Sequence, residues 1–417
     1  MACLDLAKQR LDHRRVRESD AIAFYLPMHT ATRLALPVID RVRAWNPAAR
    51  LLAYGLYAPL NDRLLRDRGV AHVIGGEFED DLVAAICGLE RPAAQPGARL
   101  DPVPRVQFHV PLRESLPPLS RYATLQLGEV RKTVGYTEAS RGCKHRCRHC
   151  PIVPVYDGRF RIVPIPIVLG DVRGQVAAGA EHITFGDPDF FNGVRHAAEL
   201  MRAFASEFPG ISYDVTIKIE HLLRHPEMVP VLRDTGCLFV TSAVESVDDG
   251  ILARLEKGHT RADFERAVRV CRDAGVTLAP TFVPFTPWTT LDGYCALLQA
   301  IDALDLVGHV APIQLAIRLL IPEGSRMLEL DDVRGIVGPY SPASLTYPWR
   351  HANPAVDDLQ HHIERLAGKH LGADRSALFD RVWDDAHAAA GVQPPPRRET
   401  GALPRAAIPY LNEPWYC

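Results

Sequence analysis

The feature that most constrains the fold is a regular alternation of strand-like and helix-like patterns between residues 133 and 320. Amphipathic helical stretches such as VRHAAELMRAFASEF separate six apolar stretches of strand type. These six are TVGYTEAS, HITFG (182–186), ISYDVTIKI (211–219), CLFVTSAV (237–244), VTLAPTFV (276–283) and VAPIQLAIRLL (310–320). Repeated βα units predict a parallel sheet that curls into a partial barrel, with its chemistry in the loops that follow the strands.

A shorter α/β pattern comes before this region. Residues 20–28 and 49–57 have the pattern of buried strands, and a third short strand, AHVIGG, is followed by a helical stretch. Seven prolines then fall between residues 91 and 118, where neither a helix nor a central strand can persist. We therefore predict four parts: a small α/β domain at 1–90, a linker at 91–130, the partial barrel at 131–330, and a helical extension with a tail at 331–417.

Composition excludes several kinds of protein. The formal net charge of −2 gives no overall positive field for nucleic acid or an anionic membrane surface. Nine cysteines are scattered over 417 residues, unlike a secreted disulfide scaffold. The charged N-terminus lacks the apolar core of a signal peptide, and no stretch approaches the roughly 20 apolar residues of a membrane span. These patterns predict a cytoplasmic protein without nucleic-acid or membrane partners.

Three cysteines gather in one short stretch, SRGCKHRCRHCP, directly after the first strand of the second region. Cys143, Cys147 and Cys150 are separated by three and then two residues, which favours a thiolate-bound metal or cluster. A cubane iron–sulfur cluster normally takes four thiolates, so three would leave one iron open to another ligand. The alternative is a zinc site of Cys3His type, completed by His145 or His149.

The spacing and position of these cysteines resemble those of the radical S-adenosylmethionine (radical SAM) superfamily. The resemblance implies a 4Fe–4S cluster on the three cysteines, with S-adenosylmethionine on the open iron. It further implies reductive cleavage to a 5′-deoxyadenosyl radical, an external electron donor such as a flavodoxin or ferredoxin-like protein, and a substrate that we expect to be a small molecule.

Other stretches resemble the superfamily at matching places and suggest contacts to S-adenosylmethionine. His149 stands where an aromatic residue usually packs on adenine, and FGDPDFFNG stands where a glycine and acid motif meets the methionine amino group. The expected cofactor-binding residues are His149, Gly186, Asp187, Asp189, Lys218, Glu220, Ser242, Glu245 and Arg318. Structural roles compete with these assignments: a turn and helix cap at Asp187, a paired or solvated face at Lys218 and Glu220, and helix first-turn chemistry at Glu245.

The first domain resembles the N-terminal domains of cobalamin-dependent radical SAM enzymes, including its run from Gly76 to Glu79. The Asp-x-His-x-x-Gly cobalt-ligand motif is missing, and the nearest histidine is His29. Two roles stay open for this domain: binding cobalamin, or only shaping the substrate pocket.

The chain ends in an apolar, aromatic segment, ALPRAAIPYLNEPWYC. Together with PTFVPFTPWTT (280–290), it resembles radical SAM proteins that continue as Cys-selenocysteine-Ala-Glu-Pro or Cys-Cys-Ala-Glu-Pro. Under that resemblance Cys417 is half of a pair, stands one residue before a selenocysteine position, and contributes to catalysis. A hydrophobic strap on the barrel is the alternative. The selenol of a selenocysteine at that position would bind a soft element such as arsenic or selenium.

Overall, the sequence predicts an α/β protein with a small Rossmann-like N-terminal domain followed by a partial (β/α)6 TIM-like barrel. The favoured function is a radical SAM enzyme, with cobalamin-dependent methyl transfer and cobalamin-independent transfer of a SAM fragment both open. A non-catalytic zinc-bearing scaffold and an RNA-modifying enzyme are the other classes that we consider.

Overall fold

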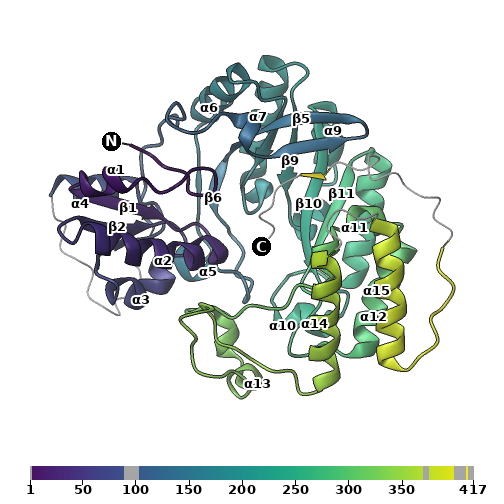
Figure 1. The fold of residues 1–417 in the computed structure, drawn as a ribbon. Coiled ribbons are helices and arrows are strands. Elements are labelled where there is room, and N and C mark those ends of the chain that lie inside the picture. The colour runs from purple at the N-terminus through teal and green to yellow at the C-terminus, as the bar shows by residue number, and fades with distance from the viewer. Residues whose placement is uncertain (1, 89–102, 370–374, 399–409, 412–417) are drawn as a thin grey trace.

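The computed structural model describes residues 2–88, 103–369, 375–398 and 410–411. Its N-terminal part is a small α/β domain, drawn in purple in Figure 1, that stands beside the larger sheet. Three parallel strands form this first sheet in the order β1 (Ala21–Tyr25), β2 (Arg50–Tyr54) and β3 (Val70–Ile74). Its helices are α1 (His13–Arg17), α2 (His29–Trp45), α3 (Asp62–Arg66) and α4 (Glu79–Cys87).

Helix α2 shows why this first domain folds as the pattern predicts. Its buried residues, Leu36, Ile39 and Val42, recur at intervals of three, so one face of the helix packs on the sheet. Leu51 and Leu52 of β2 are fully buried, as expected for a central parallel strand. This domain is therefore the Rossmann-like unit predicted before the linker.

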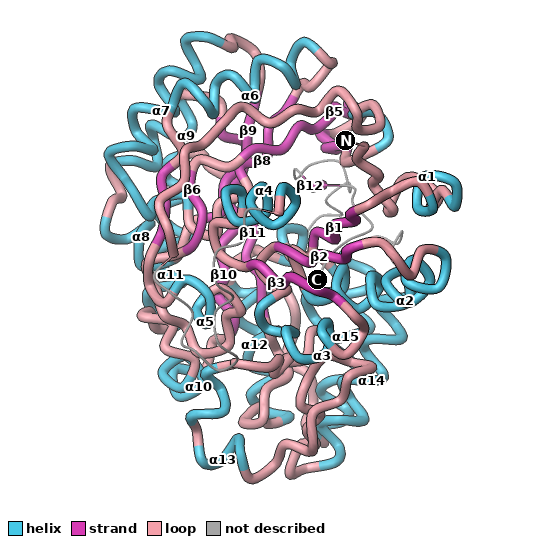
Figure 2. The backbone as a smooth tube through the Cα atoms, turned by 90° about the vertical axis from the view of Figure 1, so that its left-hand side faces the viewer, coloured by secondary structure: helices cyan, strands magenta, loops and turns pink. Residues whose placement is uncertain are grey.

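The second part is built on a curled sheet of seven strands, in the order β11-β10-β9-β8-β5-β4-β12. The five strands from β5 to β11 are parallel, whereas β4 and β12 are added antiparallel at one edge. Their bounds are β4 (Thr124–Leu127), β5 (Val130–Thr137), β8 (His182–Phe185), β9 (Ser212–Thr216), β10 (Cys237–Glu245), β11 (Thr277–Phe282) and β12 (Tyr410–Leu411). Figure 2 shows this sheet curling around the middle of the molecule.

Helices cover the outside of the curled sheet, and one apolar core lies between the two layers. They are α6 (Ile165–Ala177), α7 (Val194–Glu207), α8 (Ile219–Arg224), α9 (Met228–Asp234), α11 (Arg261–Ala274) and α12 (Leu291–Ala303). Helix α10 (Asp249–Arg254) instead places Ile251 in a second apolar cluster with Leu319 and Trp349. Short elements complete this part: α5 (Val153–Tyr156), α13 (Asp331–Arg334) and the hairpin of β6 (Ser140–Gly142) and β7 (Phe160–Ile162). Of two long helices, α15 (Arg375–Ala390) packs against α12, and α14 (Pro354–Lys369) packs against α15 (Figure 1).

The fold class is confirmed, but one expected strand is wrong. The expected sixth strand at 310–320 is reduced to a 3-10 turn (Pro312–Leu315) and one bridge between Phe285 and Arg318. Pro312 fixes its own φ and has no N–H to donate, which favours the turn over a strand. In addition, β4 lies inside the predicted linker, and β5 begins at Val130 rather than after it.

The domain boundaries predicted at 90, 130 and 330 stay predictions. Cys417, expected to be catalytic, lies outside the described residues. In the part of the chain that the structure describes, no helix is both long enough and apolar enough to cross a membrane.

Arg141, which belongs to β6, joins the two α/β parts. Its guanidinium contacts Glu79 and lies 3.2 Å from Glu77 in the N-terminal domain, and it donates to Glu138 of the barrel at 2.8 Å. Glu77 is fully buried and also accepts a hydrogen bond of 3.0 Å from the Tyr156 hydroxyl. Burial raises the pKa of Glu77, and Arg141 opposes that rise. The N-terminal domain is thus tied to the segment that leads into the cysteines.

Candidate functional site

The three cysteines lie on one loop that begins directly after β6. Cys143 and Cys147 are buried, Cys150 is partly exposed, and all three are free thiols. The Cys150 N–H donates to the Cys147 carbonyl at 3.2 Å, which closes the last turn of the loop. Burial raises the pKa of Cys143 to about 12 and that of Cys150 to about 11. Since metals bind thiolates, a cation that binds here must displace these protons.

Asn192 holds the start of the loop in place. Its side-chain oxygen accepts from the Lys144 N–H at 3.1 Å, and its amide nitrogen donates to the Gly142 carbonyl at 3.1 Å. These bonds span the first cysteine, and Asn192 is itself buried. The loop conformation is therefore set by the turn after β8 as well as by its own sequence.

Two buried lysines bring positive charge to the cysteines. The Lys218 ammonium lies 3.8 Å from the Cys147 sulfur and 3.7 Å from the Glu220 carboxylate. Lys257 is also buried, and its charge acts on Cys147 and Cys150. Such cations stabilise thiolates and an anionic thiolate cluster. Lys218 follows β9 as the N-cap of α8, and Glu220 lies in the first turn of that helix, not in the third barrel strand as expected.

The structure brings together His149 and Glu245, two residues that the sequence predicts for the site. The His149 ring nitrogen Nε2 lies 3.0 Å from Glu245, whose carboxylate also contacts Lys257 at 3.2 Å. Burial raises the pKa of Glu245, but Lys257 and His149 outweigh that effect and hold it at about 2. Glu245 ends β10 with a φ of 68°, a left-handed conformation that is unusual for a glutamate. The three groups form a buried ionic cluster next to Cys150.

Asp187 and Ser242 have structural partners rather than open binding positions. Both Asp187 oxygens are engaged, with the Ala139 N–H at 2.8 Å and the Ser140 hydroxyl at 2.6 Å. Burial raises the pKa of Asp187 to about 7 although these hydrogen bonds oppose it. The Ser242 hydroxyl donates to the Ile217 carbonyl at 2.6 Å. These residues position the loop before the cysteines and the end of β9, respectively.

Gly186 is required by a close neighbour, because a Cβ there would lie 1.8 Å from the Tyr136 hydroxyl oxygen. Arg318 is engaged by two residues of the C-terminal extension. Its guanidinium donates to Asp357 at 2.6 Å and to the Trp349 carbonyl at 2.9 Å, and it stacks over the Trp349 ring. The predicted contact of Arg318 with a carboxylate of S-adenosylmethionine stays a prediction.

Asp189 lies beside two histidines that the sequence analysis did not assign to this place. His221 Nδ1 is 2.6 Å from the Asp189 oxygen Oδ2, and His145 Nε2 is 3.4 Å from it. His221, Asn192 and Lys257 were all missed. In the sequence these residues are marked by their position after a strand or in the helix that follows it. Many residues without a functional role share that position.

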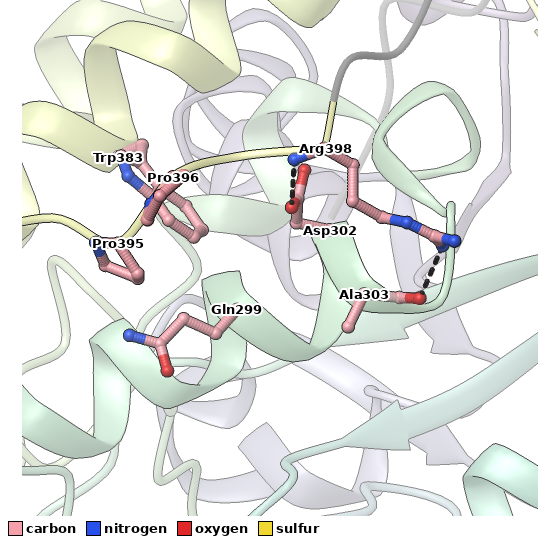
Figure 3. A pocket seen from close by; sticks show the side chains of 7 residues that line it. All are labelled: Gln299, Asp302, Ala303, Trp383, Pro395, Pro396 and Arg398. Atoms are coloured by element: carbon pink, nitrogen blue, oxygen red, sulfur yellow. Dashed lines mark hydrogen bonds between the residues drawn. The ribbon is translucent and has the colours of Figure 1, made fainter.

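A separate hollow of about 400 Å³ lies between α12, α15 and the segment that follows α15 (Figure 3). It contains none of the expected site residues. There the Arg398 backbone N–H donates to Asp302 at 3.1 Å, and its guanidinium donates to the Ala303 carbonyl at 2.8 Å. The residues that line it are Gln299, Asp302, Ala303, Trp383, Pro395, Pro396 and Arg398. We treat it as a packing feature of the extension.

The donor set of the loop fits an iron–sulfur cluster. Three free thiols within eight residues at the carboxyl end of a barrel strand are soft ligands, with Lys218 and Lys257 to offset negative charge. Residues 137–289 match the sequence profile of the Radical SAM superfamily, and they include the cysteine loop, Asp187 and Glu245. These residues are therefore similar to a radical SAM domain, and the superfamily uses a 4Fe–4S cluster and S-adenosylmethionine.

Curated relatives match the chain over part of its length. A tRNA-2-methylthio-N(6)-dimethylallyladenosine synthase of Chlorobium luteolum is 30% identical over 160 residues, which are 34% of this chain and 34% of that protein. A ribosomal protein uS12 methylthiotransferase RimO of Parabacteroides distasonis is 25% identical over 176 residues, 39% of this chain and 40% of that protein. The chain thus spans between a third and two fifths of these relatives.

Solved structures resemble the chain over both of its parts. The cobalamin-dependent S-adenosylmethionine radical enzyme OxsB, with aqua-cobalamin bound, aligns with a TM-score of 0.64 at 14% identity, over 89% of this chain and 63% of that one. The radical S-adenosylmethionine methyltransferase TsrM from Kitasatospora setae, with cobalamin and a [4Fe-4S] cluster bound, aligns with a TM-score of 0.57 at 18% identity, over 91% and 90%. At these identities the likeness concerns the fold.

Proposed function

We propose that this chain is a radical SAM enzyme that binds a 4Fe–4S cluster through Cys143, Cys147 and Cys150 and S-adenosylmethionine at the fourth iron. The observation that supports this proposal is the set of three free thiols on one loop at the carboxyl edge of the curled sheet. When bound, the cluster supplies the electron that cleaves S-adenosylmethionine. An external reductant of flavodoxin or ferredoxin type delivers that electron.

The chain's own residues have distinct tasks in this proposal. Lys218 and Lys257 balance the charge of the thiolates, and Asn192 fixes the path of the loop. His149 and Glu245 form one wall of the site and present buried polar atoms to the cosubstrate. Among the described residues the buried His149 nitrogen Nδ1 has no hydrogen-bond partner, so it is available to a bound ligand.

Anaerobic reconstitution with iron and sulfide tests the cluster assignment. The wild-type protein should turn brown and hold about four irons per chain, and with a reductant it should convert S-adenosylmethionine to 5′-deoxyadenosine. Cys143→Ala should lose both properties. Cys87→Ala is the matched control because Cys87 is an exposed thiol at the end of α4. A colourless protein with one zinc per chain contradicts the proposal and supports the zinc-bearing scaffold.

A cobalamin-binding measurement distinguishes between two roles of the N-terminal domain. The fold likeness to OxsB and TsrM, which spans both parts of the chain, supports binding of cobalamin. The alternative is a structural domain, since the carboxyl edge of its sheet carries Tyr25, Tyr54 and Phe78 in mutual contact and Glu77 bound to Arg141. Equilibrium dialysis with hydroxocobalamin, followed by the visible spectrum of the protein fraction, decides between them.

We propose a small-molecule substrate. The names of the relatives specify a tRNA adenosine and a ribosomal protein, whereas this chain has a net charge of −2 and little general attraction for RNA. A salt-dependent gel shift with bulk tRNA checks this point: tight binding that weakens steeply with salt contradicts the proposal and favours an RNA substrate.

A further inference from the structure

A buried cluster of two histidines and one carboxylate lies beside the cysteine loop. His145, Asp189 and His221 each point one ligand atom into the same place, and these atoms all lie within 4.8 Å of one another. His221 and Asp189 have no exposed side-chain surface, and His145 is 14% exposed. The three residues come from three different elements: the cysteine loop, the turn after β8, and α8.

The atoms of this cluster contact one another but make no well-aligned hydrogen bond within the described residues. No hydrogen bond is made by the Asp189 oxygen Oδ2, the His145 nitrogen Nε2 or either ring nitrogen of His221 within the described residues. An unsatisfied buried polar atom costs about 1–3 kcal/mol, so several in one place call for a ligand. The contacts of 2.6 and 3.4 Å to the Asp189 oxygen place the two rings around it.

Two of the three ligands, Asp189 and His145, are oriented by a second contact. The other Asp189 oxygen accepts from the Phe191 N–H at 3.2 Å, which leaves Oδ2 to face the histidines. The His145 nitrogen Nδ1 lies 3.5 Å from a Glu220 oxygen, the kind of carboxylate partner that fixes a histidine tautomer and leaves Nε2 free to ligate. The two imidazole rings lie 4.7 Å apart with their planes at 57°, so they converge without stacking.

We propose that His145, Asp189 and His221 bind a divalent cation of borderline softness, such as Zn²⁺ or Fe²⁺, next to the cluster loop and distinct from the cluster. Two imidazoles and one carboxylate suit such metals, whereas the three thiols select a cluster iron. Three protein ligands leave at least one position open to water or to a polar group of the substrate. The ion also fastens the loop between Cys143 and Cys147 to the turn after β8 and to α8.

Cobalt is a suitable probe because its X-ray absorption can be measured separately from that of iron. The cluster-loaded protein is incubated with Co²⁺, gel-filtered without oxygen, and analysed for iron and cobalt per chain. We expect about one cobalt in addition to about four irons, with only nitrogen and oxygen in the first shell. His221→Gln and His145→Gln should each weaken cobalt binding by at least about 10-fold and leave the iron content unchanged.

His225→Gln is the matched control, because His225 follows the same helix α8, is partly exposed, and lies outside the cluster. It should bind cobalt like the wild type. His145→Gln keeps the test valid if the buried His221→Gln fails to fold. Three results overturn the proposal: no cobalt after gel filtration, cobalt with sulfur neighbours, or a loss of iron that parallels the loss of cobalt in His145→Gln.

Discussion

Replacing Glu245 with glutamine should destabilise the fold strongly, because the change leaves a buried cation without its partner. Lys257 is 3% exposed and its ammonium lies 3.2 Å from the Glu245 carboxylate. Burial opposes ionisation of Glu245, yet Lys257 and His149 hold its pKa at about 2, against an ordinary 4.5. A pKa difference of that size corresponds to roughly 3 kcal/mol, within the range of about 3–5 kcal/mol for removing one partner of a buried pair.

Urea denaturation at pH 7, followed by tryptophan fluorescence, measures this loss. Glu245→Gln should lower the free energy of unfolding by about 3 kcal/mol. The double variant Glu245→Gln/Lys257→Met should recover at least about half of that loss, because it removes the stranded charge. Glu265→Gln is the surface control: its ion pair with Arg261 is half-exposed, so the change should be below about 1 kcal/mol.

The pH dependence has a defined sign. Because the pKa of Glu245 is depressed in the folded protein, its contribution is fully present above pH 4.5 and is lost as the pH falls toward 2. Wild type and Glu245→Gln should therefore converge in stability as the pH falls through that interval. The reasoning is refuted if Glu245→Gln lies within about 1 kcal/mol of the wild type at pH 7, or if the double variant is no more stable than the single one.

Three further outcomes follow from the site. Asn192→Ala should weaken cluster retention, seen as iron lost on gel filtration, because it removes both hydrogen bonds that flank the first cysteine. Arg318→Met should leave the affinity for S-adenosylmethionine within about 2-fold in equilibrium dialysis, since this guanidinium pairs with Asp357; a larger loss would support the contact predicted from the sequence. Gly186→Ala should cost about 1–3 kcal/mol in urea denaturation, because the new methyl meets the Tyr136 ring, and a wild-type midpoint would contradict that contact.

The barrel strands were predictable because their burial is continuous. HITFG and CLFVTSAV became β8 and β10 to within one or two residues, since short apolar runs between helices have few other ways to be buried. The stretch at 310–320 has the same apolar character, yet it forms a 3-10 element that begins at Pro312, with one bridge. Pro280 lies within β11, so one missing N–H does not by itself exclude a strand, and the local pattern of 310–320 could not settle its conformation.

The cysteine loop could be predicted from spacing, whereas its surroundings could not. Glu245 and Lys257 are twelve positions apart and meet only because α10 reverses the chain between them. His221 lies more than seventy positions from His145, so their convergence depends on the curvature of the sheet. Arg318 was a candidate because it is a charged residue in an apolar stretch, and the sequence could not show that the folded chain also gives it an ion pair with Asp357.

Arg141 makes the N-terminal domain a thermodynamic partner of the cysteine loop. It stands two residues before Cys143 and contacts Glu77 and Glu79 across the boundary. Coupling free energies are reciprocal, so a ligand that binds the loop better when the small domain is docked must also lower the equilibrium population of the open domain, by the same factor. Amide hydrogen exchange in β1 to β3 should thus slow when a ligand binds to the cysteines. A protease that cleaves the small domain should also act more slowly once the cysteines are occupied.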